Sequence, residues 1–307
     1  MNKNKIESYF FLGILSIIWG SSFILMKKGM LAYSAPQVAS LRIFIAGLVF
    51  IPFVIKHFRE IPWNNYKYVL IFAFLEIGFP PYLYTFAQQH IDSSSAGILN
   101  SMVPIFTLAT GVVIFRLRYN LLTTLGVFVG LLGALIITYM KSIGASGSQF
   151  DMSNSWGLLI LIATFFYAIA GNVLKEHLNE VPGAMVTGLS FVSMAIPAGI
   201  YLFADGFVGV TFSGGEHVIQ SLLSVTILSV FGSALAILMF SKLIQVSNAL
   251  FASFVTYLIP FVSLLWGWLD NENISLVHFS SLAIIFLGIF LASSGEKRNK
   301  TNVNLVH

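Results

Sequence analysis

Between Gly13 and Ala292 the chain is a nearly continuous series of apolar stretches, each long enough to cross a bilayer, and its charges are confined to short connections. Hydrophobic residues make up 57% of the sequence and charged residues only 9%. In a soluble globular protein, about a quarter of the residues are charged. The pattern therefore predicts an integral membrane protein, whose function is carried out within a bilayer.

The length of the chain sets the number of spans that it can form. Each span needs about 20 apolar residues, so 307 residues with short loops accommodate about ten helices. We expect them near residues 9–28, 37–55, 67–86, 94–115, 121–140, 156–174, 184–203, 219–241, 248–269 and 276–294. The third span contains Pro80 and Pro81, which remove two backbone donors where lipid offers no replacement. It is therefore predicted to be kinked and packed against other helices.

Basic residues are divided unevenly between the two sides of this arrangement. With a cytoplasmic N-terminus, twelve Lys and Arg residues lie inside, Lys27, Lys28 and Lys141 lie outside, and Arg42 lies within a span. An excess of basic residues in cytoplasmic connections orients membrane proteins, so we expect both termini in the cytoplasm. The sequence has no soluble basic domain, so the net charge of +4 does not indicate nucleic-acid binding.

The two halves of the sequence are related by a repeat. A shift of 156 residues superposes Gln89, Ala96 and Pro104 on Gln245, Ala252 and Pro260. We expect a first five-helix repeat at 1–140, a polar linker at 141–155, a second repeat at 156–296 and a basic, polar tail at 297–307. Because five is odd, the second repeat enters the membrane from the opposite face. Inverted repeats of this kind are typical of secondary transporters, which bind substrate between the halves.

Five segments, spread over nearly the whole chain, carry a family resemblance. They are IIWGSSFILMKKGM at 17–30, PQVASLRIFIAG at 36–47, SAGILNSMVPIFTLATGVVIF at 95–115, NALFASFVTYLIPFVSLLWGWLDNE at 248–272 and LAIIFLGIFLASSG at 282–295. Together they resemble the EamA-type transporters of the drug/metabolite transporter superfamily. The resemblance implies ten helices as two inverted five-helix repeats. It also implies an inner-membrane permease, usually an exporter of amino acids, other small metabolites or drugs.

One family motif is present in only one half of this chain. The family's Gly-Glu after the fourth helix falls near Arg116 to Arg118, where this chain reads FRLRYN. In the second half, Glu272 of DNE holds the matching position. Any role of that carboxylate would therefore survive in one repeat only.

Two charged side chains lie inside predicted spans. Arg42, early in the second span, costs about 2.5–3.5 kcal/mol near the membrane centre unless it has a partner. It either binds an anion such as a substrate carboxylate, or ties helix ends or lipid headgroups together. Glu76, in the middle of the third span, either carries a proton during an exchange cycle or hydrogen-bonds backbone freed by the prolines. Glu76 is thus the candidate coupling group.

Polar residues in the middle of other spans indicate a central cavity. Asn100 and Tyr257 lie shortly before Pro104 and Pro260, at matching points of the two repeats, where proline makes the backbone deformable. The candidate substrate-binding residues are Trp19, Ser22, Arg42, Asn100 and Tyr257. The candidate helix-breaking or gating residues are Pro80, Pro81, Pro104 and Pro260. Apolar walls with a few polar anchors suit an amphipathic metabolite such as a hydrophobic amino acid.

Enzymatic motifs are absent from the sequence. The six histidines lie in loops or at span ends, HExxH and GxxxxGK[ST] do not occur, and there is no Cys. We therefore expect no catalytic residue, metal or cofactor, and a transport cycle driven by a gradient. The prediction is a secondary-active permease that exports a small metabolite across a lipid bilayer, with protons as a candidate coupling ion. The alternatives are a passive channel or facilitator, and a non-transporting membrane scaffold or sensor; the oligomeric state stays open.

Overall fold

The computed structural model describes residues 3–90, 96, 99–144, 156–259, 262, 280 and 283–295. Within these ranges the regular secondary structure is helical and no strand occurs. Six helices are long and apolar enough to span a membrane: Ile6–Gly29, Ala35–Lys56, Trp63–Gln88, Gly157–His177, Gly183–Ala204 and Val218–Val246. Four shorter apolar helices, Val103–Val113, Leu121–Gly133, Ala249–Ile259 and Ala283–Gly295, overlap the other four predicted spans. The described chain is therefore an all-helical membrane protein, as predicted.

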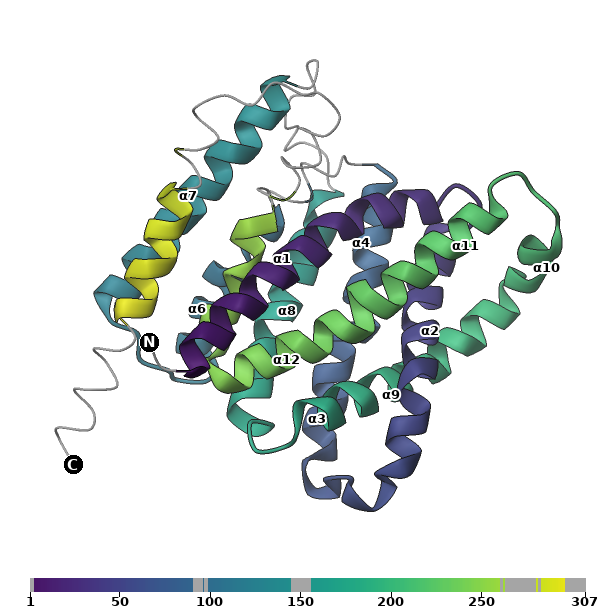
Figure 1. The fold of residues 1–307 in the computed structure, drawn as a ribbon, viewed down its shortest axis with the longest axis horizontal. Helices are drawn as coiled ribbons and strands as arrows, with labels where there is room; N and C mark the ends of the chain where they lie inside the picture. Colours follow the sequence, from purple (N-terminus) through teal and green to yellow (C-terminus); the bar gives the residue numbers. More distant parts are fainter. Residues whose placement is uncertain are drawn as a thin grey trace.

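Figure 1 shows the helices gathered into one bundle. Helix α1 (Lys3–Gly29) runs beside α11 (Val218–Ile227) and α12 (Ala236–Val246). Helix α2 (Ala35–Lys56) packs along α9 (Gly183–Ala204), and this is the most extensive contact between two helices of the described chain. The pairs thus join segments that lie far apart in the sequence.

Small residues allow α2 and α9 to approach closely. A side chain at Gly47 would meet the Cβ of Ala195 and would lie 3.0 Å from the backbone oxygen of Phe191. Beside this contact, the rings of Phe50 and Phe191 stack with their centroids 5.8 Å apart. The pair holds α2, and with it Arg42, inside the bundle.

The third predicted span is irregular before its two prolines. It consists of α3 (Tyr66–Phe72), a π-helical segment η3 (Ala73–Gly78) and α4 (Pro80–Gln88). The ring of Pro80 cannot pack against the carbonyl of Glu76 as in a regular α-helix. The helix therefore widens, Phe79 N donates to the Phe74 carbonyl at 3.0 Å, and a new helix starts at Pro80. The kink predicted from the prolines is a widened turn that contains Glu76.

A second widened turn occurs between α11 and α12, where the sequence has no proline. The π-helical segment η4 (Leu228–Leu235) joins these helices, and Ser233 Oγ donates to the Leu228 carbonyl at 3.2 Å. When η3 is shifted by 156 residues, it falls on residues 229–234, inside η4. The two irregular segments therefore occupy matching places under the shift that relates the sequence halves.

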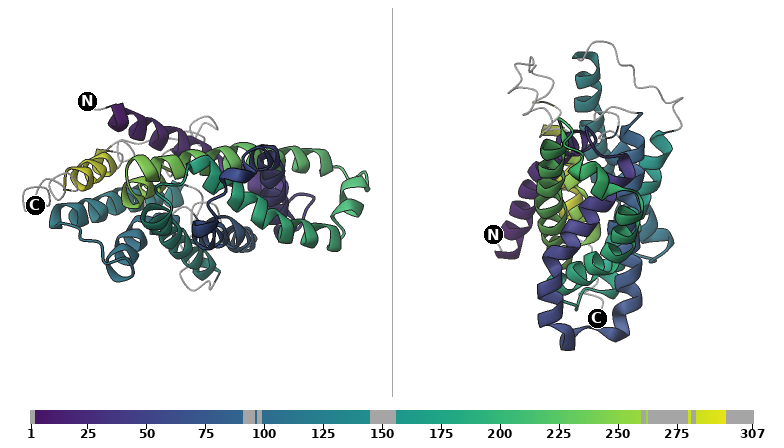
Figure 2. Two further views of the ribbon diagram at one scale, coloured as in Figure 1. Left: turned by 90° about the horizontal axis from the view of Figure 1, so that it is seen from below. Right: turned by 90° about the vertical axis from the view of Figure 1, so that its right-hand side faces the viewer.

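Helix α7 (Leu121–Gly144) and the helix Ala283–Gly295 lie side by side at one edge of the bundle (Figures 1 and 2). A Cβ at Gly126 would lie 2.7 Å from the backbone oxygen of Gly288. A Cβ at Gly288 would in turn lie 2.6 Å from the Cα of Gly130. The two backbones come this close only because glycines stand on both sides.

Helix α8 (Gly157–His177) lies in the middle of the bundle, against α4, α6 (Val103–Val113) and α13 (Ala249–Ser253) (Figure 1). The remaining short helices are η1 (Phe58–Glu60), η2 (Trp63–Asn65) and α10 (Phe207–Phe212).

Arg116 lies at the start of the stretch, Arg116 to Arg118, near which the family resemblance places its Gly-Glu. Its φ of 56° is in the left-handed region that favours glycine. Pro260, Glu272 and residues 145–155 of the predicted linker lie outside the described residues.

Candidate functional site

A cavity of about 960 Å³, counting the open space at its mouth, lies among α1, α2, η3, α4, α6, α8, α9, η4, α12 and α13. Most of its lining side chains are apolar or aromatic. The polar and charged ones are Ser22, Arg42, Glu76, Tyr84, Asn100, Thr107, Tyr167, Ser233, Ser253 and Thr256.

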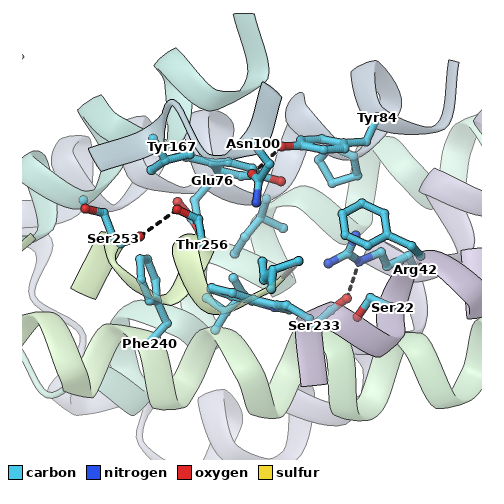
Figure 3. A pocket seen from close by; sticks show the side chains of 18 of the residues that line it. Ser22, Arg42, Glu76, Tyr84, Asn100, Tyr167, Ser233, Phe240, Ser253 and Thr256 are labelled. Atoms are coloured by element: carbon cyan, nitrogen blue, oxygen red, sulfur yellow. Dashed lines mark hydrogen bonds between the residues drawn. The ribbon is translucent and has the colours of Figure 1, made fainter. Parts of the chain in front are cut away.

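Figure 3 shows how these groups are distributed. Arg42, Ser22 and Ser233 gather at one end of the cavity. Ser253, Thr256 and Phe240 lie at the other end, and the residues between them along one wall are Tyr84, Asn100 and Tyr167. Polar groups are thus present at both ends of an otherwise largely apolar space.

The structure brings most of the predicted site residues together. Trp19, Ser22, Arg42, Asn100 and Glu76 all line this cavity. Of the predicted helix-breaking residues, Pro81 lines it, whereas Pro80 and Pro104 lie in the first turns of α4 and α6 and do not line it. Pro260 lies outside the described residues.

Tyr257 does not line the cavity, contrary to the prediction. It is fully buried, and its hydroxyl donates to the backbone oxygen of Val127 in α7 at 2.8 Å. Its ring packs where Gly130 leaves room. The neighbouring Thr256 lines the cavity instead, because adjacent residues point in directions about 100° apart on a helix. Tyr257 therefore joins two helices and leaves the set of candidate binding residues.

The widened turn η4 holds Arg42 and Trp19 in place. Arg42 Nε donates to Ser233 Oγ at 2.5 Å, and its Nη2 donates to the Gly232 carbonyl at 3.4 Å. The same carbonyl accepts a hydrogen bond from Trp19 Nε1 at 3.1 Å. In the described part of the chain, Nη1 of Arg42 has no protein partner. Arg42 is therefore anchored by protein on one side while the rest of its guanidinium group faces the cavity.

Glu76 is buried, with 4% of its surface exposed, and its Oε2 has no hydrogen-bond partner among the described residues. Within the same residues, no hydrogen bond joins the carboxyl group to the backbone before Pro80. Arg42 is the positive charge that acts on Glu76, but no ion pair within 4 Å connects them in the described chain. A buried carboxyl group in this state is costly unless it holds a proton or meets a cation. Glu76 is thus available to a ligand or a proton.

Tyr84 and Asn100 form a second polar anchor, which sequence reasoning found only in part. Tyr84 Oη donates to Asn100 Oδ1 at 2.6 Å, and the ring of Tyr84 stacks on that of Tyr167. This pairing orients the Asn100 side chain in the cavity. Sequence reasoning missed both tyrosines and Ser233.

The repeat in the sequence identifies other lining residues, since from the predicted Pro81 and Asn100 it leads to Ile237 and Thr256. Five pairs of lining residues are separated by 156 positions each, the shift that relates the two halves. They are Ile77 and Ser233, Pro81 and Ile237, Tyr84 and Phe240, Asn100 and Thr256, and Val103 and Ile259. The charged groups break this symmetry, since the position that matches Glu76 is Gly232.

The chemistry available in the cavity is recognition of a solute. Its described lining offers one guanidinium group, one carboxyl group, several hydroxyl groups and an amide, and includes no histidine. Over the described ranges, no three His, Asp or Glu side chains come together as a metal site would require. The arrangement suits a small molecule that carries charge at one end and an apolar body.

Comparisons with known proteins show the family of this chain. The profile of the EamA-like transporter family matches residues 7–139 and again residues 154–294. The "uncharacterized inner membrane transporter YedA" of Escherichia coli (strain K12) is 24% identical over 92% of this chain and 89% of its own length. The "uncharacterized transporter YoaV" of Bacillus subtilis (strain 168) is also 24% identical, over 94% of this chain and 98% of its own.

A solved crystal structure has the same fold. It superposes with a TM-score of 0.70 at 15% sequence identity, over 95% of this chain and 98% of the other. At this identity the likeness concerns the fold alone.

Proposed function

Because this chain belongs to the EamA-like transporter family, we propose that it is a secondary-active permease of the inner membrane that exports a small metabolite such as an amino acid. The observation that carries the proposal is the central cavity, with Arg42 and Glu76 inside largely apolar walls. No ATP-binding GxxxxGK[ST] motif occurs in the sequence, so a gradient of solute or protons drives the cycle. The relatives named as inner membrane transporter and transporter support membrane transport.

The cycle is alternating access between two inverted five-helix repeats, at 1–140 and 156–296, with ten membrane spans in all. Three observations support this architecture. The family profile matches the chain twice, the widened turns η3 and η4 occupy matching positions, and five pairs of cavity residues are 156 positions apart. A cavity lined by matching residues of both repeats lies where a symmetry axis between inverted halves would pass.

The proposed topology has both termini in the cytoplasm and the 141–155 linker outside. The motive is the division of twelve basic residues against three. A reporter that works only in the cytoplasm should be active when it is fused to the C-terminus. A reporter that works only outside the cytoplasm should be active when it is inserted in the linker. If only the reporter that works outside the cytoplasm is active at the C-terminus, the ten-span count is wrong.

The geometry of the cavity favours an amphipathic zwitterion such as a hydrophobic amino acid. The fork of Arg42 suits a carboxylate, and Glu76 suits an ammonium group or a proton. Aromatic walls that include Trp19, Tyr167 and Phe240 suit an apolar side chain.

Asn100 and Tyr257 provide a matched test of the cavity. Replacing Asn100 with alanine removes a polar group of the cavity, and because a hydrogen bond contributes about 1 kcal/mol, the apparent KM of the folded protein should rise by a factor of about five. It also leaves Tyr84 Oη without its acceptor, so this variant too should unfold at a lower temperature. Replacing Tyr257 with phenylalanine removes a buried hydrogen bond outside the cavity. That variant should unfold at lower temperature in detergent but keep the parent KM. The measurement is initial rates of labelled amino-acid transport in proteoliposomes, and the opposite pattern would place the site elsewhere.

A further inference from the structure

A second cavity, of about 730 Å³ with its open space included, lies beside the central one. It is formed where α6 and α8 end and where α7 and α13 begin. Its lining contrasts with the aromatic central cavity, since it includes Arg118, Lys175, Glu176 and Asn248. In the proposed topology these residues lie on the cytoplasmic side.

Only a thin layer of protein separates the two cavities. Ala249 lines both of them, and on α8 Gly171 lines the central cavity while the next residue, Asn172, lines the second. Asn172 Nδ2 donates to the Thr107 carbonyl and to Thr110 Oγ1, each at 3.0 Å, and so joins α8 to α6. The layer therefore consists of contacts between α8 and its two neighbours, α6 and α13.

Two features would allow the helices of this layer to separate. Asn172 is 1% exposed, and its Oδ1 has no hydrogen-bond partner among the described residues, so water entering the layer would satisfy a group that the closed arrangement leaves unsatisfied. Helix α13 follows the irregular backbone of Ser247 and the extended backbone of Asn248, and a turn at Phe254 interrupts the apolar helix Ala249–Ile259 directly after it. Irregular backbone on both sides lets α13 shift through changes at these few residues.

We propose that Thr107, Asn172 and Ala249 form the cytoplasmic gate of the transport path, closed in this structure, and that the second cavity is its cytoplasmic vestibule. Movement of α13 away from α8, with release of Asn172 from α6, joins the two cavities. This proposal rests on the proposed transport function.

A disulfide across the layer tests the gate directly. A Cβ on Gly171 would lie 3.5 Å from the Cβ of Ala249, within the range of a disulfide, and the chain has no cysteine of its own. In the variant Gly171→Cys/Ala249→Cys, oxidation should lower transport of labelled L-leucine in proteoliposomes at least tenfold, and a reductant should restore it. If mass spectrometry finds the cross-link complete and transport continues, the gate lies elsewhere.

A matched control places a disulfide away from the layer. A Cβ on Gly183 would lie 3.6 Å from the Cβ of Ser241, so Gly183→Cys/Ser241→Cys joins α9 to α12. Its oxidation should change transport less than twofold. If this cross-link stops transport as fully as the first, cross-linking in general, and not closure of the layer, is the cause.

A second readout does not depend on transport or on disulfide formation. Ser253, on the same short helix as Ala249, faces the central cavity (Figure 3). In inside-out vesicles, a membrane-impermeant maleimide should label Ser253→Cys slowly, and at least fivefold faster when Asn172→Ala is added. Equal labelling rates would overturn the gate, whereas failure of the cysteine-free parent to move any amino acid would count against the proposed function instead.

Discussion

Replacing Arg42 with glutamine is expected to raise the KM for a substrate that carries a carboxylate by about 10- to 150-fold. A hydrogen bond to a charged group contributes about 1.5–3 kcal/mol, and each 1.4 kcal/mol is a factor of ten. The substitution removes the guanidinium fork from the cavity and also removes the positive charge that acts on Glu76. Initial transport rates of amino acids in proteoliposomes measure the effect.

Two comparisons separate substrate binding by Arg42 from a structural role. Arg42→Lys keeps the charge but loses the paired donors, so its KM should lie between those of the parent and Arg42→Gln. An amino-acid amide, which has no carboxylate, should bind the parent and the glutamine variant equally. If the glutamine variant binds the amide and the amino acid with equally reduced affinity, Arg42 has a structural role and ties α2 to η4 through Ser233 and Gly232.

Replacing Glu76 with glutamine is expected to lower proton-driven accumulation of substrate at least tenfold while exchange of substrate for substrate continues. The amide keeps the shape of the side chain but cannot take up and release a proton. Glu76 is the buried acid of the cavity, and its Oε2 has no partner among the described residues. The measurement is uptake into proteoliposomes with and without an imposed pH gradient, beside counterflow at equal pH.

Folding of the Glu76 variant is checked by expression level and by thermal stability in detergent. Because no hydrogen bond of Glu76 supports the backbone within the described chain, both should match the parent. If gradient-driven accumulation and its pH dependence are both unchanged, Glu76 does not carry the coupling proton and has only a structural role at the helix break before Pro80. Loss of exchange and accumulation together, in a well-folded variant, would place Glu76 in substrate binding instead of coupling.

The sequence predicts the class of this protein and much of its site because bilayer physics leaves few choices. Arg42 and Glu76 stand out in apolar spans, and both line the cavity. The irregular third span follows from Pro80 and Pro81, which no regular helix accommodates.

The widened turn η4 could not be predicted in this way, since no proline marks it. Because η4 is not predicted, the hydrogen bonds of Arg42 and Trp19 to Gly232 and Ser233 cannot be predicted either. The long-range contacts of such a turn depend on which helices pack together, and local sequence does not specify that packing.

The error at Tyr257 has a different origin. Tyr257 is a polar residue shortly before a proline, and this pattern does not specify the side of the helix on which the residue lies. The repeat indicates which residue matches Asn100: the residue 156 positions later is Thr256, and Thr256 lines the cavity. Tyr257 matches Ser101, which is also buried and does not line the cavity.

The most direct test of the account is counterflow in proteoliposomes that contain the purified protein and no ATP. Each of the twenty L-amino acids is loaded inside in excess, and entry of the same labelled amino acid is followed. We predict saturable counterflow of at least one hydrophobic amino acid, lowered at least about fivefold in Arg42→Gln at concentrations near the parent KM. Entry that never saturates would indicate a channel, and no movement of any amino acid would contradict the account of this cavity as an amino-acid site.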